Sequence, residues 1–521
     1  MNARLKKIIC LVLAAALLFA SGRMQAWLNR DRDALGLTRN TVLENAPPVL
    51  AFTTIALGGF RGIISNFLWI RANDLQQDDK FFEAAQLADW ITKLEPTFTQ
   101  VWLFQGWNMA YNISVKFKDP TDRWRWVENG IELLRDDGLK YNENNVLIHR
   151  ELAWFFQHKM GANLDDANMY YKARWAQEMM PFFGPGGTNF AALLNPVTPT
   201  ERTNALVLRD RYKIDAKFAK SVDEKYGPLD WRLPEAHAIY WGRLGLDDAD
   251  KNPGKVKSDD LITLRRIIYQ SLLQSMHHGR LTIDPYTRRP SLTPNLEVVP
   301  ILNETYEEMF REETQAGQRD GILKAQRNFL RDAVYFLYEA NRISDAQKWF
   351  KYLGDKFPDK PVIENQPDSL PRTLTLDEYA VAVVQIDIGE TSQDRVTAAV
   401  QGLLFRAYYD LAIGEDDRYE NLKRLANRVY QRYTQKTSGF NGADRIPLPP
   451  YNQLNSQVLT QLLDPDQGIP YAARAALRTQ LGLPAEPQKA AAAPTTAPAP
   501  GDAATNAAPE VTTNPAPTAI P

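Results

Sequence analysis

Cysteine and histidine are scarce in this chain of 521 residues. The single cysteine, Cys10, lies in an N-terminal apolar stretch, so the rest of the chain has no disulfide, thiolate metal site or cysteine nucleophile. Of the five histidines, His149 and His158 stand nine positions apart, which is not the spacing of a pair of helical metal ligands. The sequence also lacks a P-loop, a nucleophile elbow, a zinc-protease helix and a dinucleotide fingerprint. These absences favour a non-enzymatic protein without metal or cofactor.

An excess of charge of either sign is also missing. The 61 Lys and Arg residues nearly balance the 63 Asp and Glu residues, so nothing in the net charge points to nucleic acid as a partner. Aromatic residues, in contrast, make up 11% of the chain, including 12 Trp, which indicates folded cores. His237 lies beside Tyr240 and Trp241 and is predicted to be a hydrogen-bonded core residue.

Long apolar runs are few, and the first one has the pattern of an export signal. Arg4, Lys6 and Lys7 precede the run Ile8–Ala20, which keeps the N-terminus in the cytoplasm and translocates the bulk of the chain. Apolar residues continue beyond this run, so we expect the segment 1–28 to stay as a signal anchor. The chain would then be a single-pass protein of the cytoplasmic membrane with its bulk in the periplasm. Signal-peptide cleavage and a free periplasmic or secreted protein are the alternative.

The second apolar run, Val49–Ile70, has the length of a membrane span but carries Arg61 near its middle, where a charge is costly. Glycines at 58, 59 and 62 also interrupt it. We therefore interpret it as a buried or membrane-surface segment that leads from the linker 29–62 into a core helix. If the run crossed the bilayer, the bulk of the chain would return to the cytoplasm.

Helical periodicity dominates the rest of the chain. In 80–94 the apolar residues fall on one stripe, and Asn163 precedes an acidic first turn as a helix cap would. The Gly-Pro-Gly-Gly at 184–187 lacks the context of a phosphate loop and is predicted to be a turn. The proline-punctuated stretch 280–303 is expected to be extended, with a small hairpin. Helices are predicted over 80–94, 100–115, 123–135, 146–159, 163–180, 201–226, 234–246, 261–277, 304–357, 376–388, 393–413 and 419–434.

Residues 84–106 carry the spacing of a known repeat. Ala84 lies twelve residues before Pro96, and Trp102 and Gly106 follow that proline by six and ten residues. Small residues let helices approach each other, a tryptophan fills the remaining gap, and a proline ends the helix before the turn. In this stretch the chain resembles the tetratricopeptide repeat, a unit of about 34 residues built from two helices.

The same spacing recurs less regularly elsewhere. Ala346 lies twelve residues before Pro358 with Phe350 between them, and Gly130 occupies the small-residue position of another copy. The whole chain also looks like a family of membrane-anchored bacterial proteins, which names no activity. We expect an all-α fold, an irregular α-solenoid of hairpins similar to tetratricopeptide repeats; an irregular helical domain with chance matches is the alternative. The predicted parts are 1–28 anchor or signal peptide, 29–62 linker, 63–182 repeat-like block, 183–303 irregular helical region, 304–484 second repeat-like block and 485–521 disordered Ala/Pro/Thr-rich tail.

The resemblance also implies where a partner would bind, because ligands of such repeats lie against the first helix of each hairpin. Aromatic rings beside amide and guanidinium groups suit an extended peptide. The simpler interpretation is that the aromatic members pack between helices. The positions that correspond are Asn66, Trp69, Asn73, Gln77, Leu103, Trp107, Tyr111, His149, Arg150, Phe156, Arg331, Asp332, Tyr335 and Tyr338.

Three functions remain open from the sequence. The leading hypothesis is a membrane-anchored scaffold or adaptor that binds protein or peptide partners at the cell envelope. The second is an envelope enzyme with its site in the irregular region 183–303. The third is an accessory subunit of a membrane transport or assembly complex.

Overall fold

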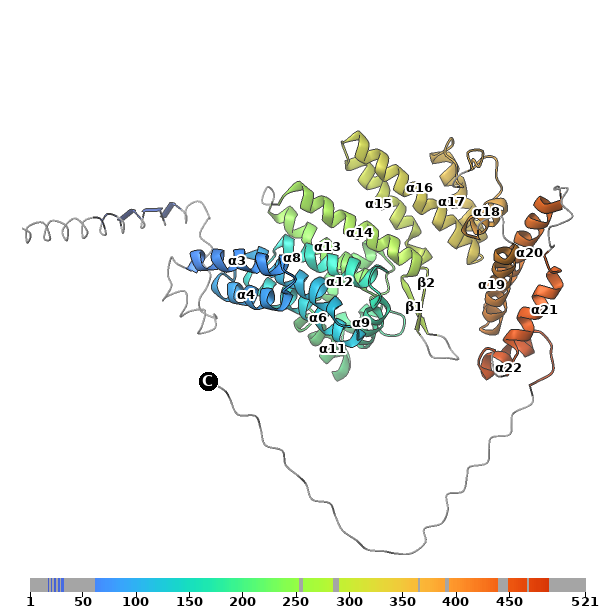
Figure 1. Cartoon of the computed structure of the whole chain (residues 1–521), viewed down its shortest axis with the longest axis horizontal. Helices are drawn as coiled ribbons and strands as arrows, with labels where there is room; N and C mark the ends of the chain where they lie inside the picture. The colour runs from blue at the N-terminus through green and yellow to red at the C-terminus, as the bar shows by residue number, and fades with distance from the viewer. Residues whose placement is uncertain are drawn as a thin grey trace, which may run out of the picture. The chain divides into compact units, whose positions relative to one another are not determined.

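The computed structural model describes residues 61–486 apart from 253–255, 284–289, 364–365, 389–392, 439–447 and 466–467, together with isolated positions between 17 and 31. Residues 487–521 of the predicted tail 485–521 lie outside the described residues, and so do the first twelve residues, Val49–Phe60, of the second apolar run. Most of the predicted anchor 1–28 and of the predicted linker 29–62 also lies outside them. The described chain is almost entirely helical, which confirms the all-α class. It divides into two compact units, residues 1–383 and 384–521 (Figure 1).

The first unit is a series of helices interrupted by one hairpin. Before the hairpin come α3 (Arg61–Gln77), α4 (Phe81–Leu94), α5 (Thr99–Trp107), α6 (Pro120–Glu132), α7 (Leu139–Tyr141), α8 (Val146–Trp154), α9 (Asn168–Phe183), α10 (Phe190–Leu194), α11 (Pro199–Asp210), α12 (Ala216–Tyr226), α13 (Pro234–Lys251) and α14 (Ser258–His278). The strands are β1 (Arg280–Ile283) and β2 (Pro290–Thr293), which pair antiparallel and confirm the predicted hairpin. After it come α15 (Val299–Glu312), α16 (Ala316–Glu339), α17 (Ile343–Lys356) and α18 (Leu376–Ile388), whose last residues belong to the second unit.

Consecutive helices pack against each other in hairpins. The closest such pairs in the first unit are α3 with α4, α13 with α14, and α16 with α17. Figure 1 shows α3 and α4 lying side by side. The helix α8 in turn packs along α13, so the core continues from one pair to the next. Within the described residues, no helix is both long enough and apolar enough to span a lipid bilayer.

Three helices of the first unit widen into π-helical turns. These are η3 (Asn108–Ile113) after α5, η5 (Leu133–Gly138) after α6 and η6 (Phe155–Gly161) after α8. Short 3-10 turns occur at η4 (Ser114–Lys116) and η7 (Leu296–Val298). A π turn inserts an extra residue into the helix and re-aims the side chains that follow it. The α5–η3, α6–η5 and α8–η6 helices are neighbours in the fold.

The second unit contains α19 (Gln393–Ala412), α20 (Asp416–Ser438), α21 (Tyr451–Leu462) and α22 (Tyr471–Gln480). The helix α19 packs against each of the other three. The core of this unit includes the fully buried side chains Leu404 of α19 and Leu422, Leu425 and Val429 of α20. Folded contacts extend to Glu486, whose carboxylate accepts two hydrogen bonds from Arg474.

Several predicted helix boundaries are wrong. The helix expected from Asn163 begins instead at Asn168, because the Asp165 carboxylate accepts a hydrogen bond from the Ala167 amide and holds a turn there. The predicted helix 201–226 is two helices, since Lys213 has φ 55° and Asp215 caps the second of them. The predicted helical stretch 304–357 consists of three helices, α15, α16 and α17, whereas α10, α21 and α22 were not predicted. The turn at 184–187 is confirmed.

Candidate partner-binding cleft

The helix α14 presents one face to a cleft of the first unit. Ile262, Arg265, Arg266, Tyr269 and Gln270 line this cleft. Their spacing of three and four residues places all of them on one side of the helix. The opposite side of α14 carries the fully buried residues of the core, so the helix is held by that side and leaves the mixed aromatic and polar face open.

The other two walls come from α15 and α16, which meet in a short turn. From α15 the cleft receives Tyr306, Met309 and Glu312, with Glu313 just after the helix. From α16 it receives Gln318, Gly321, Ile322 and Ala325, again at helical spacing. The turn between the helices is fixed by Arg319, whose guanidinium lies 4.1 Å from the centre of the Phe310 ring.

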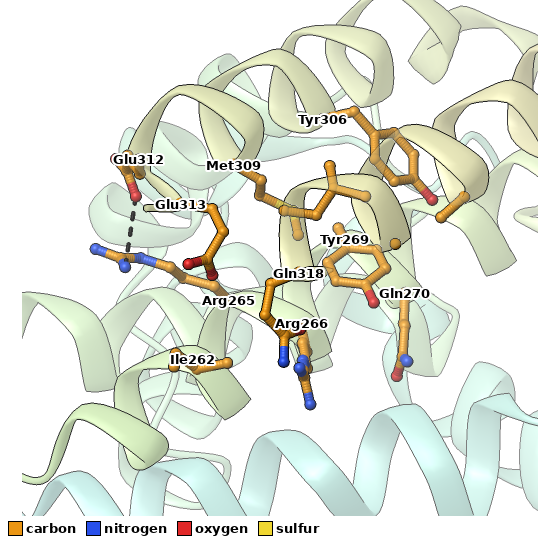
Figure 2. A pocket seen from close by; sticks show the side chains of 13 residues that line it. Ile262, Arg265, Arg266, Tyr269, Gln270, Tyr306, Met309, Glu312, Glu313 and Gln318 are labelled. Carbon is orange, nitrogen blue, oxygen red and sulfur yellow. Dashed lines mark ion pairs between the residues drawn. The ribbon is translucent and has the colours of Figure 1, made fainter. Parts of the chain in front are cut away.

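The floor of the cleft is apolar and its rim is charged (Figure 2). Tyr306 is buried, its ring lies 5.6 Å from that of Tyr269, and burial raises the pKa of its phenol, which therefore stays protonated. On the rim, Arg265 pairs with Glu312 across 3.4 Å, the ion pair drawn in Figure 2. Arg266 is exposed and has no ion-pair partner among the described residues.

A polar network behind the cleft holds α15 against α16 and α17. The Glu307 carboxylate accepts hydrogen bonds from Gln326 at 2.6 Å and Tyr352 at 2.8 Å, and it pairs with Lys356. Burial alone would raise the pKa of Glu307, but these bonds hold it below its usual value. Gln326 also donates to Asn303 at 2.9 Å. The carboxylate is therefore ionised and satisfied, and it serves to fix the helices rather than to react.

An ion pair at one end and a close polar contact at the other hold α14 to its neighbours. Asp260 near its start pairs with Arg150 of α8. Near its end, His277 lies 3.3 Å from Asp332 of α16. Since both ends of α14 are tied to other helices, the face between them is a preformed wall.

The size and chemistry of the cleft suit part of a polypeptide. Its volume is about 290 Å³, which is at the lower limit of pockets that hold small ligands. One or two side chains of a partner would fill it. The amides of Gln270 and Gln318 line the cleft together with the Arg266 guanidinium (Figure 2), where they can bond a peptide backbone and a carboxylate. The described residues contain no group of three or more His, Cys, Asp or Glu side chains placed to hold a metal ion.

The binding residues predicted from the sequence lie outside this cleft, and the first four of them are on α3. Asn66 and Gln77 are exposed on α3, while the Asn73 amide donates to the Trp69 carbonyl at 3.0 Å. The Trp69 ring lies 5.1 Å from that of Phe104 and is half-buried. This aromatic residue therefore packs between helices.

Trp107 and Tyr111 are brought together with two residues that the prediction did not include. Their rings stack at 5.4 Å, and the Tyr111 hydroxyl lies 3.2 Å from Nδ1 of His158. His158 in turn stacks on Trp154 at 4.5 Å. The π turns η3 and η6 supply Tyr111 and His158, so the insertion of a residue in each helix aligns this ladder of rings.

Four of the predicted binding residues are buried. They are Leu103, His149, Phe156 and Tyr338. His149 lies 3.2 Å from the Asp248 carboxylate, and Tyr338 donates to Asp377 at 2.6 Å. In this structure these side chains hold helices together.

The remaining predicted residues are engaged at helix contacts or near them. Arg150 pairs with Asp260, and Asp332 faces His277. The backbone carbonyl of Arg331 accepts a hydrogen bond from Tyr379, while Tyr335 is half-buried beside Phe336 on the same helix. The sequence-based set includes none of the cleft residues. The signal that could have found them is the run from Ile262 to Gln270, where one helix face mixes aromatic, basic and amide side chains.

His237 is a core residue, as predicted. It is fully buried, its Nε2 lies 2.9 Å from the Trp231 carbonyl, and burial lowers its pKa to about 4. The ring is therefore neutral at pH 7 and packs at 5.0 Å from Trp175. Its role is to fill and satisfy the core between α9 and α13.

In the structure, the residues that carry the repeat-like spacing around Trp102 pack against one another. Ala84 is fully buried, and the Trp102 indole donates to the Pro96 carbonyl at 2.8 Å. A Cβ on Gly130 would lie 2.9 Å from the Gly106 carbonyl oxygen, so α5 and α6 cross at van der Waals contact of their backbones.

The residues that repeat this spacing later in the chain are buried only in part. Ala346 is fully buried, and Phe350 stacks on Tyr379 at 5.4 Å, whereas Pro358 is exposed. The resemblance to tetratricopeptide repeats remains a prediction from such residues. Comparison with known proteins found no family model, no curated protein and no solved structure that matches this chain.

Proposed function

We propose that this chain is a membrane-anchored helical scaffold at the cell envelope that binds a segment of a protein partner in the α14–α15–α16 cleft. The observation that carries the proposal is the cleft itself, a preformed concavity whose floor is Tyr306 and Met309 and whose rim carries Arg266. The N-terminal basic and apolar sequence supports membrane attachment, with the helices on the periplasmic side.

The chemistry of the lining supports a partner segment of one kind. A large apolar side chain would enter between Tyr269, Tyr306 and Met309, where a few buried contacts can dominate binding. An acidic side chain next to it would pair with Arg266. The amides of Gln270 and Gln318 would bond the backbone of an extended peptide.

The proposal is tested by selecting peptides from a random displayed library on the full-length protein in detergent. Charge reversals at Arg266 and at Lys324 should both leave the fold intact, because both side chains are exposed. The first tests the cleft and the second is its control. We expect selected peptides to pair a large apolar residue with an acidic one. Arg266→Glu should weaken their binding by about tenfold or more, since a charge-assisted hydrogen bond contributes about 1.5–3 kcal/mol.

The matched charge reversal Lys324→Glu lies on α16 outside the cleft lining and should leave the dissociation constant unchanged. Titration calorimetry with a synthetic copy of the selected peptide measures both constants. Failure to select any peptide, or equal binding to wild type and Arg266→Glu, would show that the cleft does not bind such a segment.

A further inference from the structure

The helix α3 exposes large apolar side chains on one side. Ile63, Phe67 and Ile70 are 66%, 72% and 62% exposed. Their spacing of four and three residues places them along a single stripe. The other side of the helix, with Ala72 and Leu75, is buried against α4. A contiguous stripe of this kind is a contact surface rather than ordinary scatter of apolar residues.

The polarity of α3 changes along its length. Residues 62–70 contain no charged side chain, whereas 71–77 contain Arg71, Asp74 and two glutamines. A helix that binds a protein groove has its polar and apolar residues separated around its circumference. A change along the axis instead matches surroundings that are apolar at one end of the helix and aqueous at the other.

The sequence before α3 continues the same character. The run Val49–Phe60 has no charged residue, so Arg61 is the only charge between Val49 and Ile70. The exposed stripe therefore extends an apolar run of the chain into the folded unit. Arg71 is exposed directly after the stripe, where its guanidinium can meet lipid phosphate groups.

We propose that residues 63–70 of α3 lie in the interfacial region of a lipid bilayer, with the stripe Ile63, Phe67 and Ile70 facing the acyl chains. This inference rests on the membrane location in the proposed function and is independent of the cleft. The folded helices would then contact the membrane directly, in addition to any attachment through the N-terminal segment. The first unit would then sit against the bilayer along this end of α3 rather than hang from a flexible linker.

The test uses the full chain reconstituted into phosphatidylcholine vesicles, with and without bromine on the acyl chains. A fluorescent thiol label is attached to Phe67→Cys or to Asp74→Cys, each in a Cys10→Ser background. Position 74 is the matched control, because it is exposed on the same side of α3 and lies about 10 Å further along the axis. In the unmutated chain, a label on Cys10 reports separately whether the N-terminal segment is in the membrane.

We expect brominated lipid to remove about half of the emission at position 67, as for a group 5–10 Å deep at the acyl boundary, and little of it at position 74. Absence of quenching at position 67 overturns the inference. This holds even if the emission shows that the label is shielded from water, because a protein surface, and not lipid, would then cover the stripe. If Cys10 is quenched and position 67 is not, the membrane location stands and the contact through α3 is wrong.

Discussion

Glu151 is a residue whose ionisation opposes folding. Its side chain on α8 is largely buried, and burial raises its pKa from 4.5 to about 7, with Arg150 opposing the shift. Between these two values the folded chain keeps the proton that the unfolded chain releases. The stability that the folded chain has while Glu151 is protonated is therefore fully present below pH 4.5 and is lost as the pH rises through 7.

We expect Glu151→Gln to raise the free energy of unfolding at pH 8 by about 1–3 kcal/mol, because a shift of one pKa unit corresponds to about 1.4 kcal/mol. At pH 4 the variant and the wild type should be nearly equal. Urea unfolding followed by tryptophan fluorescence at both pH values measures the difference. An equal gain at pH 4 and pH 8 would show that packing, and not ionisation, is responsible.

His237 also makes the stability of the chain depend on pH, so the effect of Glu151 must be measured as the difference between the variant and the wild type. Burial lowers its pKa from 6.5 to about 4, so the unfolded chain binds a proton in this range that the folded chain does not. Its contribution to stability is lost as the pH falls through 4, which is the opposite slope to that of Glu151. Only the difference between Glu151→Gln and wild type separates the two groups, since His237 is present in both.

At the scale of an element, the turn between α9 and α10 depends on Gly187. This residue has φ 76°, and a Cβ added to it would lie 2.2 Å from Oδ1 of Asp230. Asp230 is buried, pairs with Arg232 at 2.6 Å and accepts a hydrogen bond from the Leu281 amide at 3.0 Å. The glycine thus leaves room for a carboxylate that joins this turn, the loop before α13 and the β hairpin.

We expect Gly187→Ala to destabilise the first unit by about 3 kcal/mol or more. The left-handed backbone costs an alanine about 1–2 kcal/mol, and displacing a buried, paired carboxylate adds to that cost. Gly186→Ala is the matched control, because nothing lies within 4 Å of the added carbon and its effect should stay within about 0.5 kcal/mol. Thermal unfolding of both variants gives the comparison, and similar midpoints would contradict the role of Gly187.

The helices, but not their polar contacts, could be predicted from the sequence. Apolar spacing is local information, so the helix at 80–94 and the hairpin after residue 279 were found. The break at Lys213 was missed because its neighbours favour a helix, and the cap from Asp215 competes with them only through one side-chain bond. The cleft joins three helices, and its wall α14 is held in place by distant pairs such as Asp260 with Arg150 of α8, 110 residues apart. No local pattern specifies such a pair.

At the scale of the whole molecule, the two compact units should unfold separately. Residues 1–383 and 384–521 each have their own buried core, which is the condition for a unit to unfold cooperatively by itself. One substitution in each unit tests this. In the first, a Cβ at position 130 would press on the Gly106 carbonyl at the crossing of α5 and α6. In the second, Gly402 is an exposed residue of α19 with nothing within 4 Å of an added Cβ.

Scanning calorimetry in detergent should therefore show two transitions that the variants move in opposite directions. Gly130→Ala should lower the transition of the first unit, because overpacking a helix crossing costs about 1–3 kcal/mol. Gly402→Ala should raise that of the second unit by about 4 °C, since alanine is favoured over glycine in an exposed helix by about 0.5–1 kcal/mol. If each variant moves both transitions together, or if a single transition is seen, the two units do not fold independently.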